Sequence, residues 1–438
     1  MSFVEPLPGF REFYPDQCRV RNYVFDIWRR VCRAHNFQEY VVPTLQPTDL
    51  FVEKSGPEIV GQLFNFVDKG EREVTLPPEV TPYACQMVGK KAASLKRPLR
   101  WFSIPECFRY ERAQKGRTRS FYQLNADVFD DASTAAEVEL ISLTIDIFRA
   151  FGLTAADIVV RLSDRTLWVE FLKGMGVPAE RILDVLGVID KWEREDKSEI
   201  VKKLADIVGP GKVEALRDGI SGLMECSNPD FLDQFLRKQL SGKSLETAFE
   251  RVILMRSILK DLESMGLGDF VRIDFRIVRG LAYYTGFVYE VFDSAQKSRA
   301  LAGGGRYDHL VEKLGGPSMP AMGMGAGDVT LVDLLIEKKL MPGFIDSIDF
   351  YIGYTSEATR TIALRKAAEL RDAGFVVEIP LHDTGFGKQM KSANKMGATA
   401  MIIIGDDEAA NGMATVKDFA TGAQRQIPLE GLARNLRA

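Results

Sequence analysis

Residues 108–119 are Phe108-Arg109-Tyr110-Glu111-Arg112-Ala113-Gln114-Lys115-Gly116-Arg117-Thr118-Arg119. An apolar segment that starts at Trp101 leads into them, and in the residues that follow, 121–130, apolar and polar side chains alternate. Alternation with a period of two is typical of a strand that has one face on the core. The sequence therefore predicts a hairpin, with strands at 101–110 and 121–130 joined by a basic loop at 112–120.

Positive charge is concentrated in this hairpin. The first strand is expected to end with Arg109 and Glu111 on one face, and a loop with four cations follows it. A planar guanidinium makes bidentate contacts with phosphate oxygens, so arginines at the end of a strand favour a phosphate site. A solvated hairpin tip is the alternative, and it is the simpler interpretation for Lys115 and Arg119. It does not fit Arg109, because a sheet position beside Phe108 should be partly buried and an unpaired buried guanidinium is costly.

Outside the hairpin, the first 340 residues contain both strand-like and helical patterns. Helical periodicity without strand signals extends from about 166 to 260 and predicts a helical insertion in a sheet domain. Three consecutive glycines, 303–305, would weaken a strand unless a ligand or another backbone comes close. Further strands are expected at 271–278, 287–292 and 299–301, and a helix is expected at 328–338.

The pattern starts again after Met341-Pro342-Gly343. Strands and helices now alternate, which implies parallel strand pairing with crossover helices and a separate small α/β domain at 347–438. The strands are expected at 348–354, 375–379 and 400–404, and the helices at 357–373 and 388–396.

Composition excludes several classes of protein. The formal net charge is -4 with 27% charged residues and no acidic or basic tail, so a nucleic-acid surface would have to be local. The five cysteines follow no ligand spacing, which argues against a zinc site and a disulfide scaffold. No window approaches the roughly 18 apolar residues of a membrane span, and the first residues are not typical of a targeting segment. We therefore expect a cytoplasmic protein with no membrane partner, or a protein whose targeting peptide has been removed.

Four further motifs accompany the hairpin. Together with it, they resemble the histidyl-tRNA synthetases, in order and over the whole chain. The hairpin is similar to motif 2 of class II aminoacyl-tRNA synthetases, and the last two of the four are similar to the histidine-specific signatures of the family. The motifs are Gly9-Phe10-Arg11-Glu12-Phe13-Tyr14-Pro15, the segment around Pro43, Val278-Arg279-Gly280-Leu281-Ala282-Tyr283-Tyr284-Thr285-Gly286 and Gly303-Gly304-Gly305-Arg306-Tyr307-Asp308.

The resemblance implies a fold class and a reaction. The fold is α+β, with a class II synthetase core that has a six-stranded antiparallel sheet and a helical insertion at 1–340, then an α/β anticodon-binding domain at 347–438. A homodimer is implied, with Pro43 at its interface. L-histidine and ATP would form histidyl-adenylate and pyrophosphate, and the histidyl group would then pass to tRNA(His). Mg²⁺ is expected between the phosphates, held largely by ATP oxygens and water, with no protein ligand assigned.

The resemblance also implies roles for individual residues. Arg279 and Arg109 are the expected catalytic cations at the α-phosphate. Arg109, Glu111 and Arg117 are expected to bind ATP, at the α-phosphate, the adenine end and the γ-phosphate. Asp127 would accept a ring N–H of the substrate imidazole. The complete set of expected histidine-binding residues is Glu79, Thr81, Gln123, Asp127, Tyr283, Tyr284 and Tyr307.

The chain departs from the commonest form of the family at several positions. Thr330 stands where the motif 3 helix usually carries an arginine that stacks on adenine, and Asp127 stands where a glutamate is common. Such differences leave a second hypothesis open, a non-catalytic histidine-binding paralogue that regulates ATP phosphoribosyltransferase. The retained Gln114-Lys115-Gly116-Arg117 loop, the retained Arg279 and the anticodon-type domain favour the enzyme.

Overall fold

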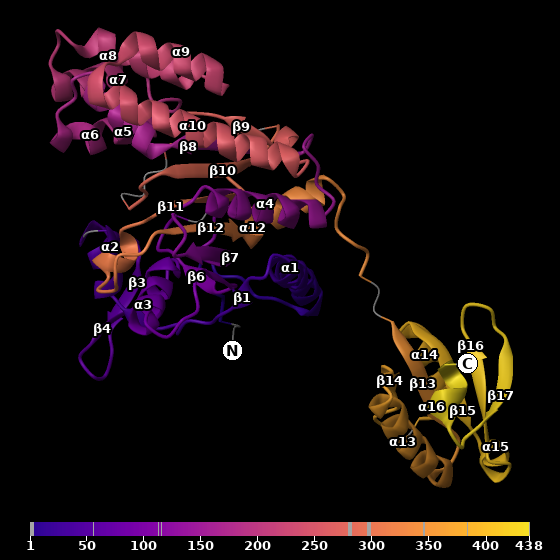
Figure 1. Cartoon of the computed structure of the whole chain (residues 1–438). Helices are drawn as coiled ribbons and strands as arrows, with labels where there is room; N and C mark the ends of the chain where they lie inside the picture. Colours follow the sequence, from indigo (N-terminus) through magenta and orange to yellow (C-terminus); the bar gives the residue numbers. More distant parts are fainter. Residues whose placement is uncertain are drawn as a thin grey trace. The chain divides into compact units, whose positions relative to one another are not determined.

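The computed structural model of the chain contains two compact units (Figure 1). They comprise Met1–Met341 and Pro342–Ala438, and each has its own hydrophobic core. The structure describes residues 4–55, 57–112, 114, 116–278, 283–295, 299–344, 347–382 and 384–437.

The first unit is built on one large, mainly antiparallel sheet. In the described part of the chain the strand order is β1-β5-β7-β12-β11-β10-β8-β9, with β6 paired to β7. The strands from β5 to β8 in this order are antiparallel to one another, whereas β1 and β9 pair in parallel at the two edges. The predicted α+β class with an antiparallel core is therefore confirmed. The bounds are β1 Gln38–Glu39, β5 Leu99–Ser103, β6 Glu106–Phe108, β7 Ser120–Phe129, β8 Ile158–Asp164, β9 Val271–Ile273, β10 Phe287–Asp293, β11 Ala302–Arg306 and β12 Ala321–Gly327.

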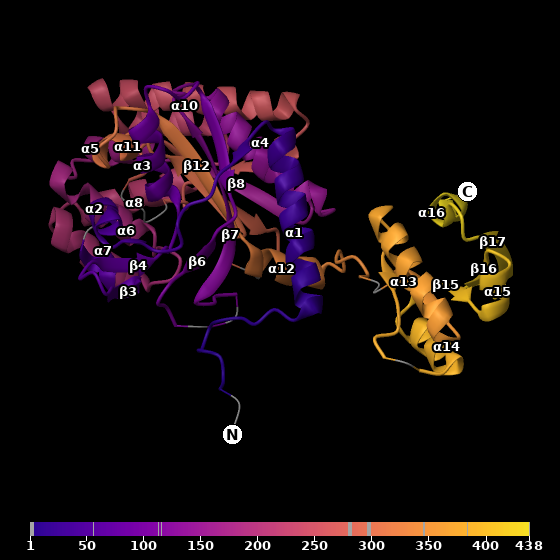
Figure 2. The same cartoon turned by 90° about the horizontal axis from the view of Figure 1, so that it is seen from below.

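Helices pack on both faces of this sheet (Figures 1 and 2). On one face, α1 and α4 bury apolar side chains together with Leu124 and Ala126 of β7. Successive residues of a strand point to opposite faces, so Gln123, Asn125 and Asp127 point to the other face. That second face carries a smaller core, which covers only part of it. The helices are α1 Pro15–Ala34 and α4 Ala135–Ala150 on the first face, and α2 Asp49–Ser55, α3 Thr81–Lys91 and α11 Leu310–Lys313 on the second.

Between β8 and β9 the chain is helical, in the segment where the sequence shows helical periodicity. Figure 1 shows α6 to α9 grouped beside the β8–β9 edge of the sheet. The buried residues of α10 recur every three or four positions, which places them on one face of the helix. Among the described residues, no helix is both long and apolar enough to cross a lipid bilayer. The helices are α5 Arg165–Gly174, α6 Ile182–Ile189, α7 Lys197–Val208, α8 Val213–Met224, α9 Pro229–Gln239 and α10 Gly242–Ser264.

The predicted first hairpin strand is corrected to two strands, β5 and β6. They are separated at Ile104-Pro105, because proline has no N–H to donate to a strand ladder. The carbonyl oxygen of Pro105 still accepts the N–H of Gln123 at 3.1 Å, so the break stays attached to β7. Beyond Phe108 the chain is no longer in a strand, and Arg109 and Glu111 belong to the loop rather than to the strand end.

Two other strand predictions change, and two strands of the core, β8 and β12, are not predicted from the sequence. The strand expected at 271–278 ends at Ile273, because the Asp274 side chain accepts the N–H of Arg276 and starts a turn. The strand expected at 299–301 starts instead at Ala302 and contains all three glycines. β12 is not predicted at all, since its sequence is Ala-Met-Gly-Met-Gly-Ala-Gly and glycine disfavours strands. The helix that follows, α12 (Asp328–Glu337), lies where the sequence predicts it.

The second unit contains a mixed sheet with the order β14-β13-β15-β16-β17 in its described residues. β13 pairs in parallel with β14 and β15, as the alternation of strands and helices predicts. β16 and β17 continue the sheet with antiparallel pairing, which the sequence does not predict. The bounds are β13 Ile348–Tyr354, α13 Glu357–Asp372, β14 Val377–Glu378, α14 Phe386–Lys395, β15 Ala398–Ile404, α15 Asp406–Ala410, β16 Met413–Asp418, β17 Gln424–Pro428 and α16 Leu432–Arg437.

A buried ion pair connects the sheet of the first unit to α4. Nε and Nη2 of Arg306, the last residue of β11, donate to the two carboxylate oxygens of Glu137, each at 2.6 Å. The side chains are only 7% and 2% exposed. Arg306 also donates to the carbonyl oxygens of Asp131 and Ser133, which precede α4. One guanidinium therefore holds β11, α4 and the turn between β7 and α4 together.

Removing one partner of this pair should destabilise the first unit strongly. Glu137→Gln removes the bidentate countercharge of the buried Arg306 and leaves it only the partly exposed carboxylate of Asp308, 3.2 Å away, and we expect a loss of about 3 kcal/mol in the free energy of unfolding. The measurement is urea unfolding followed by tryptophan fluorescence, because all four tryptophans lie in the first unit. The control is Asp184→Asn, which removes an exposed partner of Arg181 and should cost less than about 0.5 kcal/mol. If both substitutions had equally small effects on the free energy of unfolding, the Arg306–Glu137 pair would not be a major stabilising contact.

Candidate active site

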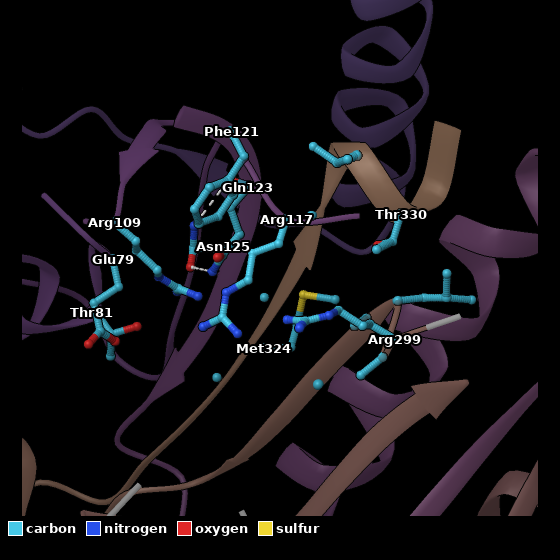
Figure 3. A pocket seen from close by; sticks show the side chains of 18 of the residues that line it. Glu79, Thr81, Arg109, Arg117, Phe121, Gln123, Asn125, Arg299, Met324 and Thr330 are labelled. Carbon is cyan, nitrogen blue, oxygen red and sulfur yellow. Dashed lines mark hydrogen bonds between the residues drawn. The ribbon is translucent and has the colours of Figure 1, made fainter. Parts of the chain in front are cut away.

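A cavity of about 300 Å³ opens on the second face of the sheet, between the hairpin loop and the strands β11 and β12 (Figure 3). The start of α3, the start of α12 and the segments before β10 and β11 complete its walls. Its lining is predominantly polar and contains both carboxylates and guanidinium groups. The described residues that line it include Glu79, Thr81, Arg109, Glu111, Arg117, Phe121, Gln123, Asn125, Tyr283, Tyr284, Arg299, Tyr307, Met324 and Thr330.

The floor of the cavity depends on glycines of β12. In the register of the antiparallel pair, Asp127 of β7 lies opposite Gly323 and Asn125 opposite Gly325. A Cβ atom at Gly323 would lie 2.0 Å from Oδ1 of Asp127, and one at Gly325 would lie 2.3 Å from Nε2 of Gln123. Neither distance is sterically possible. The polar side chains of β7 can therefore lie flat over β12 only because these positions are glycine.

One corner of the cavity is formed by an aspartate and tyrosines. The hydroxyl group of Tyr307 donates to Oδ1 of Asp127 at 2.5 Å, and Asp127 is only 1% exposed. Burial raises the pKa of the Asp127 carboxyl to about 7, although the bond from Tyr307 acts in the opposite direction. Oδ2 of Asp127 has no hydrogen-bond partner among the described residues, so an unsatisfied buried acceptor lies directly behind the cavity wall. The ring of Tyr284 lies over Gly305, where a Cβ would be 2.7 Å away.

A buried lysine supports the neighbouring carboxylate. Lys54 of α2 has a side chain with no exposed surface, and it forms an ion pair with Glu79, which is 20% exposed and lines the cavity. The ammonium nitrogen of Lys54 also lies 4.0 Å from the ring centroid of Tyr283. Burial lowers the pKa of Lys54, and the Glu79 carboxylate opposes that shift. The ion pair therefore fixes Glu79 in place beside the start of α3, where Thr81 also faces the cavity.

Three arginines from different segments converge on the cavity. Arg109 follows β6, Arg117 belongs to the hairpin loop and Arg299 precedes β11. Figure 3 shows their guanidinium groups pointing toward the middle of the cavity. The Nε–H of Arg109 donates to the carbonyl oxygen of Pro78 at 3.1 Å, and Arg117 forms an ion pair with Glu111. Burial lowers the pKa of Arg117, and the charges of Arg299 and Arg109 lower it further. Such a cluster is suited to a polyanion.

The structure brings almost all of the expected site residues together. Asp127 lies directly behind the lining and contacts it through Tyr307. Arg279 lies outside the described residues. The expected residues that line the one cavity are Glu79, Thr81, Arg109, Glu111, Arg117, Gln123, Tyr283, Tyr284 and Tyr307.

The sequence analysis missed four residues of the site. Asn125 donates to the carbonyl oxygen of Gln123 and accepts from the Gln123 amide at 2.7 Å, a pair marked in Figure 3. The period-two pattern that places Gln123 and Asp127 on one strand face places Asn125 there as well, so a signal existed. Phe121 lies 4.9 Å from the guanidinium carbon of Arg109, measured to the ring centroid. Neither Lys54 nor Arg299 has a local sequence signal that distinguishes it from the other lysines and arginines of the chain.

An antiparallel sheet whose hairpin brings arginines into a cavity beside a glycine-lined floor is the architecture of a class II aminoacyl-tRNA synthetase. A family model described as Histidyl-tRNA synthetase matches residues 9–328, and one described as Anticodon binding domain matches residues 349–438. The histidine–tRNA ligase of Opitutus terrae is 46% identical over 430 residues, which cover 98% of this chain and 97% of that protein. The chain belongs to the histidyl-tRNA synthetase family.

Solved structures share the fold. Histidyl-tRNA synthetase from Nostoc sp. PCC 7120 has a TM-score of 0.78 at 23% identity and covers 100% of this chain and 99% of its own. A Bacillus halodurans protein described as an ATP phosphoribosyltransferase regulatory subunit/histidyl-tRNA synthetase has a TM-score of 0.74 at 22% identity, covering 92% of this chain and 99% of its own. At these identities the likeness concerns the fold alone.

The Asp127 carboxyl should make histidine activation dependent on pH. Its pKa of about 7 means that the carboxylate, the better acceptor for a ring N–H, is lost as the pH falls through neutrality. A histidine side chain titrates at about 6.5, so two ionisations, one of the enzyme and one of the substrate, should shape kcat/KM for histidine near neutrality. In Asp127→Asn only the titration of the substrate should remain. The measurement is kcat/KM for histidine in adenylate formation between about pH 5.5 and 8.5.

Tyr307→Phe provides the matched control for this pH dependence. The hydrogen bond from Tyr307 stabilises the ionised carboxyl, so its removal should shift the Asp127 titration to higher pH. Identical pH profiles for the wild type, Asp127→Asn and Tyr307→Phe would show that Asp127 does not titrate in the site.

Proposed function

We propose that this protein activates L-histidine with ATP and transfers the histidyl group to tRNA(His). One observation carries the proposal: a single cavity has three guanidinium groups beside a buried Asp127–Tyr307 pair with a free acceptor oxygen. Guanidinium groups suit the phosphates of ATP, and a buried acceptor suits the ring N–H of histidine. The family to which the chain belongs supports the same reaction.

In the first step, a carboxylate oxygen of histidine attacks the α-phosphorus of ATP. The new bond joins that oxygen to phosphorus, and the bond to the oxygen that bridges to the β-phosphate breaks and releases pyrophosphate. Charge accumulates on the oxygens around phosphorus, so cations that are already in position lower the barrier. We assign this role to Arg109, whose Nε–H is held by the carbonyl of Pro78, and to Arg279, which lies outside the described residues.

The substrate histidine is proposed to bind at the end of the cavity near α3. Its ammonium and carboxylate groups would contact Glu79, Thr81 and Gln123, and Lys54 keeps Glu79 oriented. Its ring would donate an N–H to Oδ2 of Asp127. A site that hydrogen-bonds a substrate N–H rejects analogues without it far more strongly than an apolar pocket rejects a missing methylene. The tyrosines that would surround the ring are Tyr283, Tyr284 and Tyr307.

ATP is proposed to extend from Arg109 toward the hairpin loop. Arg117 would hold the γ-phosphate and Glu111 the adenine end. Because these two side chains form an ion pair, the bound ATP would be bent so that its two ends lie close together. Mg²⁺ would enter with ATP as part of the substrate, bound by phosphate oxygens and water.

The remaining partners are also proposals. The second unit matches an anticodon-binding family over 349–438, so we assign it to tRNA(His) recognition. We propose a homodimer with an interface near Pro43, because Val41 is 80% exposed and Leu45 is 44% exposed on either side of it. A cytoplasmic location would agree with a role in translation.

The alternative, a histidine-binding regulatory subunit without catalysis, is not favoured. A regulator would need the Asp127 corner but not an arginine cluster that is suited to a triphosphate. Arg109 and Arg117 both face the cavity, and the second unit is of the anticodon-binding type, for which a regulator has no use.

Histidine-dependent ATP–pyrophosphate exchange should distinguish the two functions. We expect the purified full-length protein to catalyse exchange with histidine and with no other standard amino acid, because the Asp127 corner offers an acceptor for an imidazole N–H. A histidine-binding regulator would show no exchange at any concentration of histidine. Exchange that another amino acid drives equally well would exclude the assignment of the substrate.

Arg279→Ala should lower the rate of adenylate formation by roughly 10²–10³, the scale for losing one preorganised stabilising donor. The affinities for histidine and ATP should change much less, because a transition-state cation gains strength only as charge develops. Arg279→Lys should recover part of the loss, since a point charge cannot reproduce a planar fork. The measurement is single-turnover adenylate formation alongside thermal unfolding. A variant that unfolds more easily but reacts at the normal rate once folded would show that Arg279 is structural.

A further inference from the structure

Arg299 is a charged residue of the cavity to which the reaction described above gives no role. It precedes β11, and the residues that follow it, Ala300 and Leu301, line the same cavity. Figure 3 shows its guanidinium group beside Met324, directed across the cavity toward Arg117. A long exposed side chain in this position can reach a ligand without any movement of the sheet.

The adjacent rim of the cavity lacks a cation of its own. α12 contributes Val329 and Thr330 to the lining, that is, an apolar group and a hydroxyl group. The first residue of the helix, Asp328, is buried, accepts the N–H of Tyr122 at 3.0 Å and pairs with Arg11 at 2.9 Å. An anion that lies along this rim therefore needs a positive charge from another element.

The charges around Arg117 indicate the chemistry of that anion. Burial lowers the pKa of Arg117, and the nearby charges of Arg299 and Arg109 lower it further. Neighbouring positive charges disfavour one another, and an anion that binds between them relieves the repulsion. A single carboxylate, that of Glu111, pairs with Arg117 within the lining. The excess of positive charge suits a group with several negative charges, such as a polyphosphate chain.

We propose that Arg299 binds the terminal phosphates of ATP together with Arg117, so that the two side chains hold the pyrophosphate leaving group from opposite sides. The proposal rests on the proposed function, because it adds a contact to the same ATP site. In Figure 3, Arg109 lies nearest to Glu79 and Thr81, at the histidine end, and Arg299 lies at the end where Thr330 is. The cations are thus arranged in the order α-phosphate to terminal phosphates, and Arg299 provides a guanidinium at a rim to which α12 contributes Val329 and Thr330.

The first test is histidine-dependent ATP–pyrophosphate exchange by the full-length protein. For Arg299→Ala we expect KM for ATP to rise about 10- to 100-fold, the range for losing hydrogen bonds to a charged group. KM for histidine should change less than about threefold, because the histidine contacts lie elsewhere. Arg299→Lys should recover part of the loss, since it restores the charge without the planar fork. The control is Arg272→Ala, an exposed arginine of β9 that donates to the carbonyls of Gly268 and Val271, which should leave both constants unchanged.

A binding measurement separates the terminal phosphates from the rest of the nucleotide. The probe is 5′-O-(histidylsulfamoyl)adenosine, an unreactive mimic of histidyl-adenylate that carries no β- or γ-phosphate. Arg299→Ala should bind this compound as tightly as the wild type does while it binds ATP more weakly. An unchanged KM for ATP, or an equal loss of affinity for ATP and the mimic, would overturn the proposal while the proposed function stands. If the wild type itself shows no exchange with histidine, the proposed function fails and this inference fails with it.

Discussion

A Cβ atom on Gly323 would overlap the carboxylate of Asp127, and a Cβ atom on Gly325 would overlap the amide of Gln123. The site depends on this constraint, because the polar side chains of β7 can lie over β12 only where β12 has glycine. The same face of β11 accommodates the ring of Tyr284 over Gly305. Glycine weakens a strand, and here the cost is offset by antiparallel pairing of β11 and β12 with neighbours on both sides.

Arg306, the last residue of β11, and Tyr307, the residue after it, point to opposite faces of the sheet. Arg306 points to the helical layer, where Glu137 of α4 and the carbonyl groups before α4 hold its guanidinium. Tyr307 points the opposite way and donates to Asp127. Because the backbone between them is short and stiff, the ion pair on the structural face also determines where the hydroxyl group of Tyr307 lies. The ion pair on one face and the wall of the cavity on the other are thus linked through one pair of adjacent residues.

Electrostatic complementarity divides the cavity into two ends. At the end near α3, Lys54 holds Glu79, and Asp127 keeps one oxygen without a partner among the described residues. At the other end, Arg117 and Arg299 face each other across the space. A cationic end and an end with hydrogen-bond acceptors suit the two substrates of an adenylation reaction, and they favour a single orientation of each.

Local sequence patterns were sufficient to predict several strands and helices of this protein and its family. The arginine hairpin, the restart of the pattern after Met341-Pro342-Gly343 and the motif around Tyr307 each lie within a continuous stretch, where strand and helix periods depend on near neighbours. The antiparallel core and the family followed from these stretches and their order. The break at Pro105 and the strand β12 were missed, because proline and glycine obscure the pattern that a strand otherwise shows.

Tertiary structure alone decided which distant residues meet. Asp127 lies opposite Gly323, Lys54 pairs with Glu79, and Arg299 shares one cavity with the hairpin loop, although these segments are separated in the chain. The sequence around these residues does not predict the contacts. Strand register is set by packing on both faces of the completed sheet rather than by local propensity. The sequence by itself determined the elements and the kinds of chemical group available. The order of the strands determined which of those groups share one cavity.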